Sequence, residues 1–114
     1  MIKASFEKED GEFLSLFIEG HAGQADAGKD IVCSAASILA YTVAQTITQM
    51  HKQGWLNKKP HINLKEGNGL ITCIPKEEYF DECLMVFFVA EMGFNLLATN
   101  YPQYVAVELF GEAK

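Results

Sequence analysis

The sequence is short of basic residues and has no long apolar run. Its 114 residues include 9 lysines and arginines against 15 acidic residues, which leaves a net charge of −6. A protein that binds nucleic acid by itself normally carries the opposite sign. The longest apolar run, 84–90, is far below the roughly 20 residues that a membrane-spanning helix needs. We therefore expect no direct nucleic-acid partner and no membrane segment.

Export features and a disulfide framework are missing as well. The opening residues, MIKASFEKED, contain no apolar stretch of the signal-peptide type. The three cysteines cannot all pair with one another. This combination predicts a cytoplasmic protein whose thiols are reduced.

Enough apolar material is present for one packed core. Hydrophobic residues make up 49% of the chain, and no repeat, low-complexity tract or linker divides it. A single domain over residues 1–114 is therefore expected. Short apolar segments bounded by turn residues predict five strands, at 2–7, 13–18, 61–66, 70–74 and 104–110. A turn at Asp10-Gly11 is expected to connect the first two strands into a hairpin. A turn at Gly67-Asn68-Gly69 is expected to connect the next two strands into a second hairpin.

Two helices are expected from apolar residues that recur at spacings of three and four. The first begins behind Asp30, whose short carboxylate suits an N-cap, and the second begins near Glu77, with Gly93 allowing a close approach to a neighbour. Their buried stripes comprise Val32, Ala36, Leu39, Val43, Ile47 and Met50 in the first helix and Phe80, Cys83, Phe87, Ala90, Phe94 and Leu97 in the second. The order β-β-α-β-β-α-β predicts an α+β fold of two layers, with both helices packed on one face of a mainly antiparallel sheet.

A candidate catalytic pair flanks the glycine-rich segment 20–29, which reads GHAGQADAGK and predicts a loop. With Asp30 as the cap, Cys33 becomes the third helical residue, where free N–H groups and the helix dipole favour a thiolate. His21 lies on the loop, 12 positions before Cys33, from where it can reach the helix start and act as a general base. These residues alone leave the alternative that Cys33 is a small packing residue.

The other cysteines and histidines are expected to have structural roles. Cys73 alternates within a strand and Cys83 lies on the apolar stripe of the second helix, so both are predicted to pack in the core. His51 and His61 fall at the end of the first helix and at the start of a strand. No compact metal-ligand spacing is present, and neither a metal nor a cofactor is expected.

A competing motif for phosphate binding shares the same loop. Gly23, Gly28 and Lys29 spell G-x-x-x-x-G-K, after a strand and before a helix. The hydroxyl residue that should follow is replaced by Asp30, whose charge would repel phosphate from the helix N-terminus. The chain also lacks the parallel βαβ units that carry such loops. Nucleotide binding is therefore disfavoured.

The stretch around the candidate pair resembles the signature of the ribosomal-processing cysteine protease family, Prp. The residues that carry the likeness are Gly20-His21, Ala25, Gly28, Asp30-Ile31-Val32-Cys33, Ala35-Ala36 and Ser37. The turn at 67–69, Tyr101-Pro102 and Tyr104-Val105 agree with it, so the resemblance covers nearly the whole chain. It implies a small dimeric cytoplasmic protease that removes a short N-terminal extension from a large-subunit ribosomal protein during ribosome assembly, without a cofactor.

The resemblance also implies roles for single residues. It implies Cys33 as the nucleophile of an acyl-enzyme reaction and His21 as its general base. Gly20, Asp30 and Ser37 are implied as supporting residues, with Asp30 either capping the helix or orienting His21. The alternative function is a non-catalytic, ribosome-associated binding module in which Cys33 is structural.

Two further expectations concern the loop and the assembly. The glycines of 20–29 favour a loop that is ordered by substrate, and this ordering would bring His21 to Cys33. Phe13 and Phe17 make the second face of their strand apolar, and a two-layer fold leaves one face of the sheet uncovered. We therefore expect a homodimer.

Overall fold

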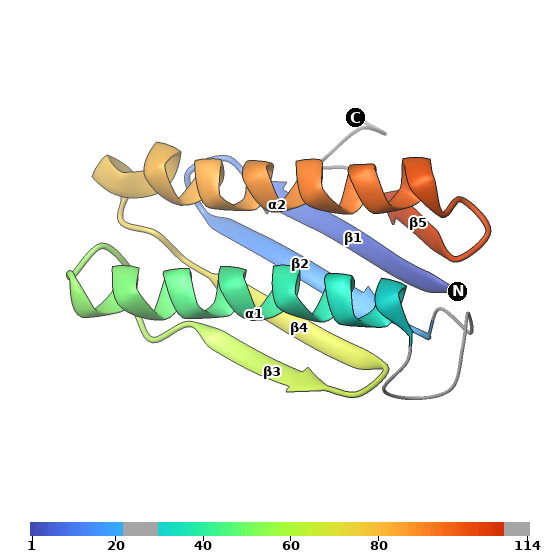
Figure 1. The fold of residues 1–114 in the computed structure, drawn as a ribbon. Helices are drawn as coiled ribbons and strands as arrows, with labels where there is room; N and C mark the ends of the chain where they lie inside the picture. The colour runs from blue at the N-terminus through green and yellow to red at the C-terminus, as the bar shows by residue number, and fades with distance from the viewer. Residues whose placement is uncertain (22–29, 109–114) are drawn as a thin grey trace.

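The computed structural model describes residues 1–21 and 30–108, which form a sheet and a helical layer (Figure 1). The strands are β1 (Ile2–Glu9), β2 (Phe13–Glu19), β3 (His61–Lys65), β4 (Asn68–Cys73) and β5 (Val105–Glu108). The helices are α1 (Ile31–Lys52) and α2 (Phe80–Asn100), with a short 3-10 turn, η1 (Glu77–Tyr79), before α2. The predicted α+β order of elements is confirmed.

The strands lie in the order β3-β4-β2-β1-β5. All neighbouring strands are antiparallel except β1 and β5, which are parallel. Both helices cover the same face of this mainly antiparallel sheet, as the sequence predicted (Figure 1). The register pairs Glu19 of β2 with Asn68 of β4, so the end of β2 lies beside the turn between β3 and β4.

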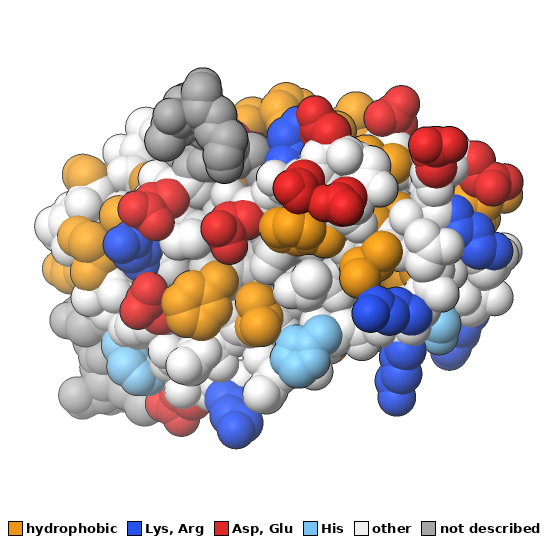
Figure 2. Space-filling model, turned by 180° about the vertical axis from the view of Figure 1, so that it is seen from behind, with side chains coloured by type: hydrophobic (Ala, Val, Ile, Leu, Met, Phe, Trp, Pro, Cys, Tyr) orange, Lys and Arg blue, Asp and Glu red, His pale blue; other side chains and the backbone are white. Residues whose placement is uncertain are grey.

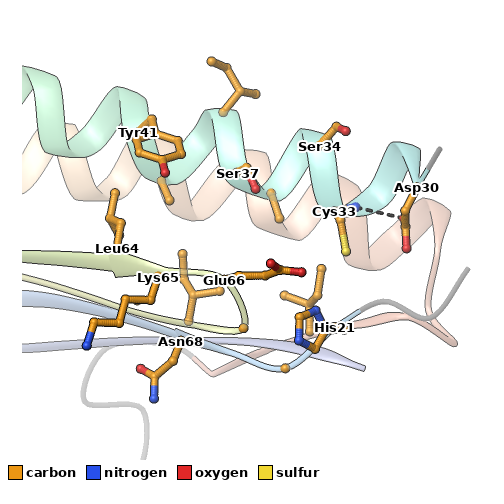
Figure 3. A pocket seen from close by; sticks show the side chains of 18 residues that line it. His21, Asp30, Cys33, Ser34, Ser37, Tyr41, Leu64, Lys65, Glu66 and Asn68 are labelled. Atoms are coloured by element: carbon orange, nitrogen blue, oxygen red, sulfur yellow. Dashed lines mark hydrogen bonds between the residues drawn. The ribbon is translucent and has the colours of Figure 1, made fainter. Parts of the chain in front are cut away.

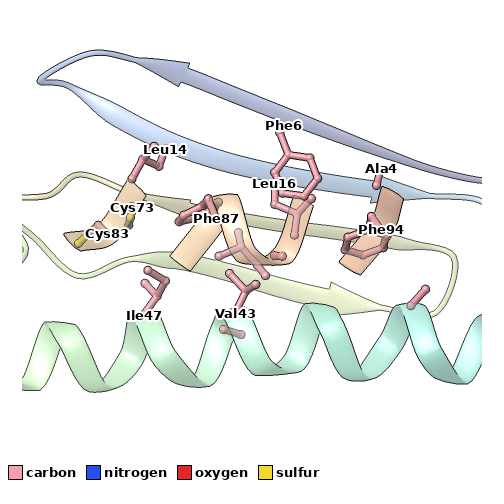
Figure 4. Packing of buried hydrophobic residues seen from close by; sticks show 14 of the residues in the cluster. Ala4, Phe6, Leu14, Leu16, Val43, Ile47, Cys73, Cys83, Phe87 and Phe94 are labelled. Atoms are coloured by element: carbon pink, nitrogen blue, oxygen red, sulfur yellow. The ribbon is translucent and has the colours of Figure 1, made fainter. Parts of the chain in front are cut away.

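The core lies between the two layers. Figure 4 shows Phe6, Leu14 and Leu16 of the sheet together with Val43, Ile47, Phe87 and Phe94 of the helices. The rings of Phe6 and Phe94 meet edge to face, with centroids 6.0 Å apart and planes at 68°. Burying each of these side chains contributes roughly 1.5–3 kcal/mol, so the packing holds both helices against one face of the sheet.

Gly93 allows a close approach between the helices, as predicted. A Cβ at this position would lie 2.7 Å from Cδ2 of Leu39, so α1 and α2 meet here because residue 93 has no side chain. Leu39 is half-buried in this contact, whereas Ala40 and Ala44 complete the stripe of α1 that faces the sheet.

Some element ends differ from the prediction. The second hairpin turns at Glu66-Gly67, because Asn68 and Gly69 pair with both neighbouring strands. The second helix begins at Phe80 rather than near Glu77, since the N–H of Tyr79 donates to the carbonyl of Lys76 in a tighter turn. Residues 109 and 110, the predicted end of the last strand, lie outside the described residues.

Large exposed apolar side chains are found mainly on the helices. They are Met1, Ile31, Ile38 and Tyr41 in the first part of the chain and Met85, Phe88, Val89, Met92 and Leu96 on α2. On the outer face of the sheet Phe13 and Phe17 are half-buried, and side chains of both charges surround the apolar ones (Figure 2). The outer face of the sheet is thus uncovered and carries Phe13 and Phe17, as expected, while the most exposed large apolar side chains lie mainly on the helices.

Two segments, Ile31–Lys52 and Glu77–Asn100, are long and apolar enough to cross a membrane by length and composition, each with a hydropathy of 1.5. Both bury a stripe of side chains in the core, including Val43 and Phe87. This is the arrangement of a core helix, which meets the same criteria of length and composition.

Candidate active site

A cavity of about 770 Å³ opens between the first half of α1 and the turn that joins β3 to β4. The residues of the predicted site all border it: Gly20, His21, Asp30, Cys33 and Ser37. Figure 3 shows Cys33 at the start of the helix and His21 on the opposite side of the cavity. The fold thus brings together the five residues that the sequence singled out.

Asp30 is the N-cap of α1. Its Oδ1 accepts a hydrogen bond of 3.0 Å from the backbone N–H of Cys33, and its carbonyl accepts the first helical bond from Ser34. The residue is only 5% exposed, so the cap is shielded from competing water. Of the two roles left open for Asp30 by the sequence, the structure shows the capping role.

Cys33 is the third residue of α1, as predicted. Its side chain is half-buried and borders the cavity, and the cap fixes its backbone. The partial positive charge at the helix start favours a thiolate over a thiol at this position. Ser37 lies one turn further along and borders the same cavity, so its hydroxyl is placed to meet whatever binds beside the thiol.

His21 lies two residues beyond the end of β2 and is exposed. The preceding residue, Gly20, has a φ of +92° and donates its N–H to the carbonyl of Gly67 at 2.9 Å. A Cβ at Gly20 would collide with the backbone carbonyl of Met1, which explains why only glycine fits there. Gly20 therefore fixes the backbone from which His21 extends.

The cavity also includes residues that sequence reasoning missed. Tyr41 continues the cavity along the helix, and Leu64, Glu66 and Gly67 form its wall on the sheet side (Figure 3). Tyr41 follows Cys33 and Ser37 at successive spacings of four, which indicates one helix face. The turn residues had no comparable signal, because only the pairing of β2 with β4 places them here.

Residues 22–29 lie outside the described residues. The predicted ordering of the loop by substrate and the phosphate motif from Gly23 to Lys29 both fall there.

Cys73 and Cys83 are buried in the core, as predicted. A hydrogen bond with Cys83, together with burial, raises the pKa of Cys73 above the ordinary value for a thiol. His51 and His61 are exposed, at the last turn of α1 and the first residue of β3. Over residues 1–21 and 30–108, no three His, Cys, Asp or Glu side chains are grouped so that they could hold a metal ion.

A thiol at a helix start and an imidazole border the same cavity, and these are the two kinds of group that nucleophilic catalysis with a general base uses. A family model described as cysteine protease Prp matches residues 1–106. The chain belongs to the cysteine protease Prp family. It is therefore a cysteine protease, and the likeness seen in the sequence is confirmed.

Solved structures similar to this Prp-family chain share its fold. The ribosomal processing protease Prp from S. aureus, with a covalently linked product peptide, has a TM-score of 0.71 and 20% identity, covering 96% of this chain and 99% of that one. The same protease with a substrate peptide has a TM-score of 0.66 and 19% identity, covering the same shares. SMU.848 from Streptococcus mutans has a TM-score of 0.66 and 25% identity, covering 96% of this chain and 94% of that one. No curated protein sequence matches the chain significantly.

Proposed function

We propose that this Prp-family protease is an endopeptidase that removes a short N-terminal extension from a large-subunit ribosomal protein during ribosome assembly. The observation that carries the proposal is that Cys33, at the capped start of α1, and His21, after β2, border one cavity. The similar S. aureus structures support it, because that protein is a ribosomal processing protease and its complexes hold a product peptide and a substrate peptide.

In this proposal Cys33 is the nucleophile and His21 the general base. His21 takes the proton of the Cys33 thiol, and the thiolate attacks the carbonyl carbon of the scissile peptide bond. The protonated imidazole then donates its proton to the departing amine, which leaves a thioester on Cys33. A water molecule that gives its proton to His21 hydrolyses the thioester and regenerates the thiol.

The cap and the helix start support this chemistry. The bond from the Cys33 N–H to Asp30 holds the first turn of α1 rigid, so Sγ keeps its position in the cavity. The positive end of the helix dipole favours negative charge there, first on the thiolate and then on the attacked oxygen. No cofactor is proposed, since Cys–His hydrolysis proceeds without one.

The cavity is large enough for several residues of a peptide. It extends from Cys33 along α1 to Tyr41, with Leu64 and Ile18 on the sheet side, so apolar and aromatic side chains border most of its length. An extended peptide with apolar residues before the cut would bury them against this surface.

We also propose a cytoplasmic homodimer. The apolar side chains of Met85, Phe88, Val89 and Met92 on the outer face of α2 support self-association, because covering them removes a contiguous apolar surface from water. Light scattering at micromolar concentration should give about twice the monomer mass. Phe88→Glu should reduce it to that of a monomer, and a wild-type monomer would contradict the proposal.

The function is tested with the ribosomal protein precursor of the host organism. The purified chain is mixed with the precursor, and the mass of the precursor is measured over time. We expect the extension to be lost with the wild type and with His61→Ala, which changes an exposed histidine outside the cavity. We expect no loss with Cys33→Ala or His21→Ala. The alternative, a non-catalytic ribosome-associated module, requires that the wild type bind the precursor without shortening it.

A further inference from the structure

Gly67 lies directly beside His21. It is the second residue of the turn between β3 and β4, and its φ is +77°. Its carbonyl accepts the hydrogen bond from the N–H of Gly20, the residue before His21. Figure 3 shows the imidazole of His21 next to the turn that Glu66 and Asn68 flank.

The imidazole occupies the space that a side chain at position 67 would need. A Cβ on Gly67 would lie 2.7 Å from Nε2 of His21 and 3.1 Å from its Cε1. Carbon and nitrogen atoms that are not bonded to each other do not approach to 2.7 Å without one of them moving. Only glycine at position 67 therefore permits the observed placement of the imidazole.

We propose that Gly67 is a positioning residue for the general base. Its missing side chain provides the place in which the His21 imidazole lies, and its carbonyl fixes the backbone just before His21. The role rests on the proposed function, because it matters for catalysis only if His21 moves protons. Proton transfer needs heavy atoms about 2.6–3.2 Å apart, and a misplacement of about 1 Å is enough to slow such a step about 100-fold.

The nature of the contact separates this role from a purely structural one. At Gly20 a Cβ would meet the backbone carbonyl of Met1, so a substitution there disturbs the fold. At Gly67 the Cβ would meet the end of an exposed side chain, which can rotate away. The clash at Gly67 is therefore relieved by displacing the imidazole, while the sheet keeps its place.

The chain contains matched controls for the backbone effect. Gly54 and Gly11 have φ values of +84° and +78°, close to that of Gly67, and a Cβ at either would meet nothing within 4 Å. Alanine at any of the three positions carries the same left-handed strain. Only at position 67 does the methyl group contact His21.

The experiment compares Gly67→Ala with Gly54→Ala and Gly11→Ala. We expect the three variants to lose similar amounts of thermal stability. Gly67→Ala alone should lower kcat for precursor cleavage about 100-fold with little change in KM. It alone should also shift the Hε1 NMR resonance of His21, assigned with a His21→Gln variant. Equal losses of kcat in all three variants, or an unshifted His21 resonance in Gly67→Ala, would overturn the proposal.

Gly67→Asn and Gly54→Asn provide a second pair. Asparagine adopts a positive φ more readily than alanine and still carries a Cβ, so the fold is retained with less strain. Gly67→Asn should displace His21 as Gly67→Ala does, and Gly54→Asn should match the wild type. If the wild-type chain leaves the precursor intact, only the proposed function is contradicted. The His21 resonance in the paired variants still tests whether Gly67 positions the imidazole.

Discussion

The two ends of α1 lie near thiols in opposite surroundings. Cys33 belongs to the helix itself, whereas Cys73 of β4 and Cys83 of α2 lie near its far end. Near the helix start, Cys33 borders the cavity and its backbone N–H is bound by Asp30. Near the helix end, Cys73 and Cys83 are buried in the core, and Sγ of Cys83 lies 3.7 Å from Sδ of Met50. At 1.5 Å per residue, Cys33 and Met50 are about 25 Å apart along the helix.

The comparison shows that surroundings decide what a thiol does. At the start of α1, water has access to Cys33 and the helix dipole stabilises negative charge, so the reactive anion is favoured. In the core, a hydrogen bond with Cys83 and burial raise the pKa of Cys73, which keeps that thiol protonated as the pH rises through the ordinary range for cysteine. One end is arranged for reaction and the other for packing.

The largest expected difference between the ends is in cleavage. Cys33→Ala should lower kcat/KM on the ribosomal precursor by at least about 1,000-fold, because the other two thiols are buried in the core, away from the cavity. Cys83→Ala, at the other end, should leave kcat/KM within about 2-fold of the wild type, because the residue is remote from the cavity. Mass measurement of the precursor N-terminus checks both. Rapid cleavage by Cys33→Ala would remove the distinction between the ends.

Alkylation by iodoacetamide sharpens the comparison without any substrate. Cys33 should react about 100-fold faster than either core cysteine, since the rate follows thiolate fraction and access to the reagent. Peptide mapping after brief labelling of the folded protein at neutral pH measures this, and the same labelling in urea provides the control, where the three rates should converge. Similar labelling of all three thiols in the folded protein would contradict an activated Cys33.

The effects of the two cysteine substitutions on stability should have the reverse order of their effects on cleavage. Cys83→Ala is expected to lower the free energy of unfolding by about 1–2 kcal/mol, because it leaves a cavity among fully buried side chains. Cys33→Ala should change it by less than about 0.5 kcal/mol, because the thiol is half-buried at the edge of the core. Urea unfolding gives both values. A larger loss for Cys33→Ala would mean that Cys33 is mainly a packing residue.

The smallest expected effect concerns the cap of α1. Asp30→Ala should lower the free energy of unfolding by about 1 kcal/mol, since the Cys33 N–H loses its buried acceptor. Asp30→Asn should lower the free energy of unfolding by only about a few tenths of a kcal/mol, because asparagine caps a helix nearly as well as aspartate. Asp30→Asn keeps the cap and removes the charge, whereas Asp30→Ala removes both. Comparing cleavage by the two variants therefore separates the effect of the cap on activity from that of the charge. Equal instability of both would mean that the carboxylate does more than cap the helix.

Much of the site could be predicted because it depends on local sequence. The capping preference of Asp30 and the spacing of apolar residues behind it placed Cys33 in the first turn of a helix, where the structure has it. The alternation of apolar residues likewise predicted the strands. The exposed apolar surface of α2 was not predicted, because Phe88 and Met92 lie beside its buried stripe in a helix that is apolar on much of its circumference.

The sequence by itself determined the elements, the cap and the place of Cys33, because each depends on residues a few positions apart. Only the tertiary structure decided that Gly67 lies beside His21 and that the end of β2 joins the turn after β3 through the bond from Gly20. That contact depends on the strand order β3-β4-β2-β1-β5, which results from how the two hairpins pair and pack beneath the helices. Periodicity specifies which face of a strand is buried, whereas the choice of neighbouring strand is made by packing of the whole domain.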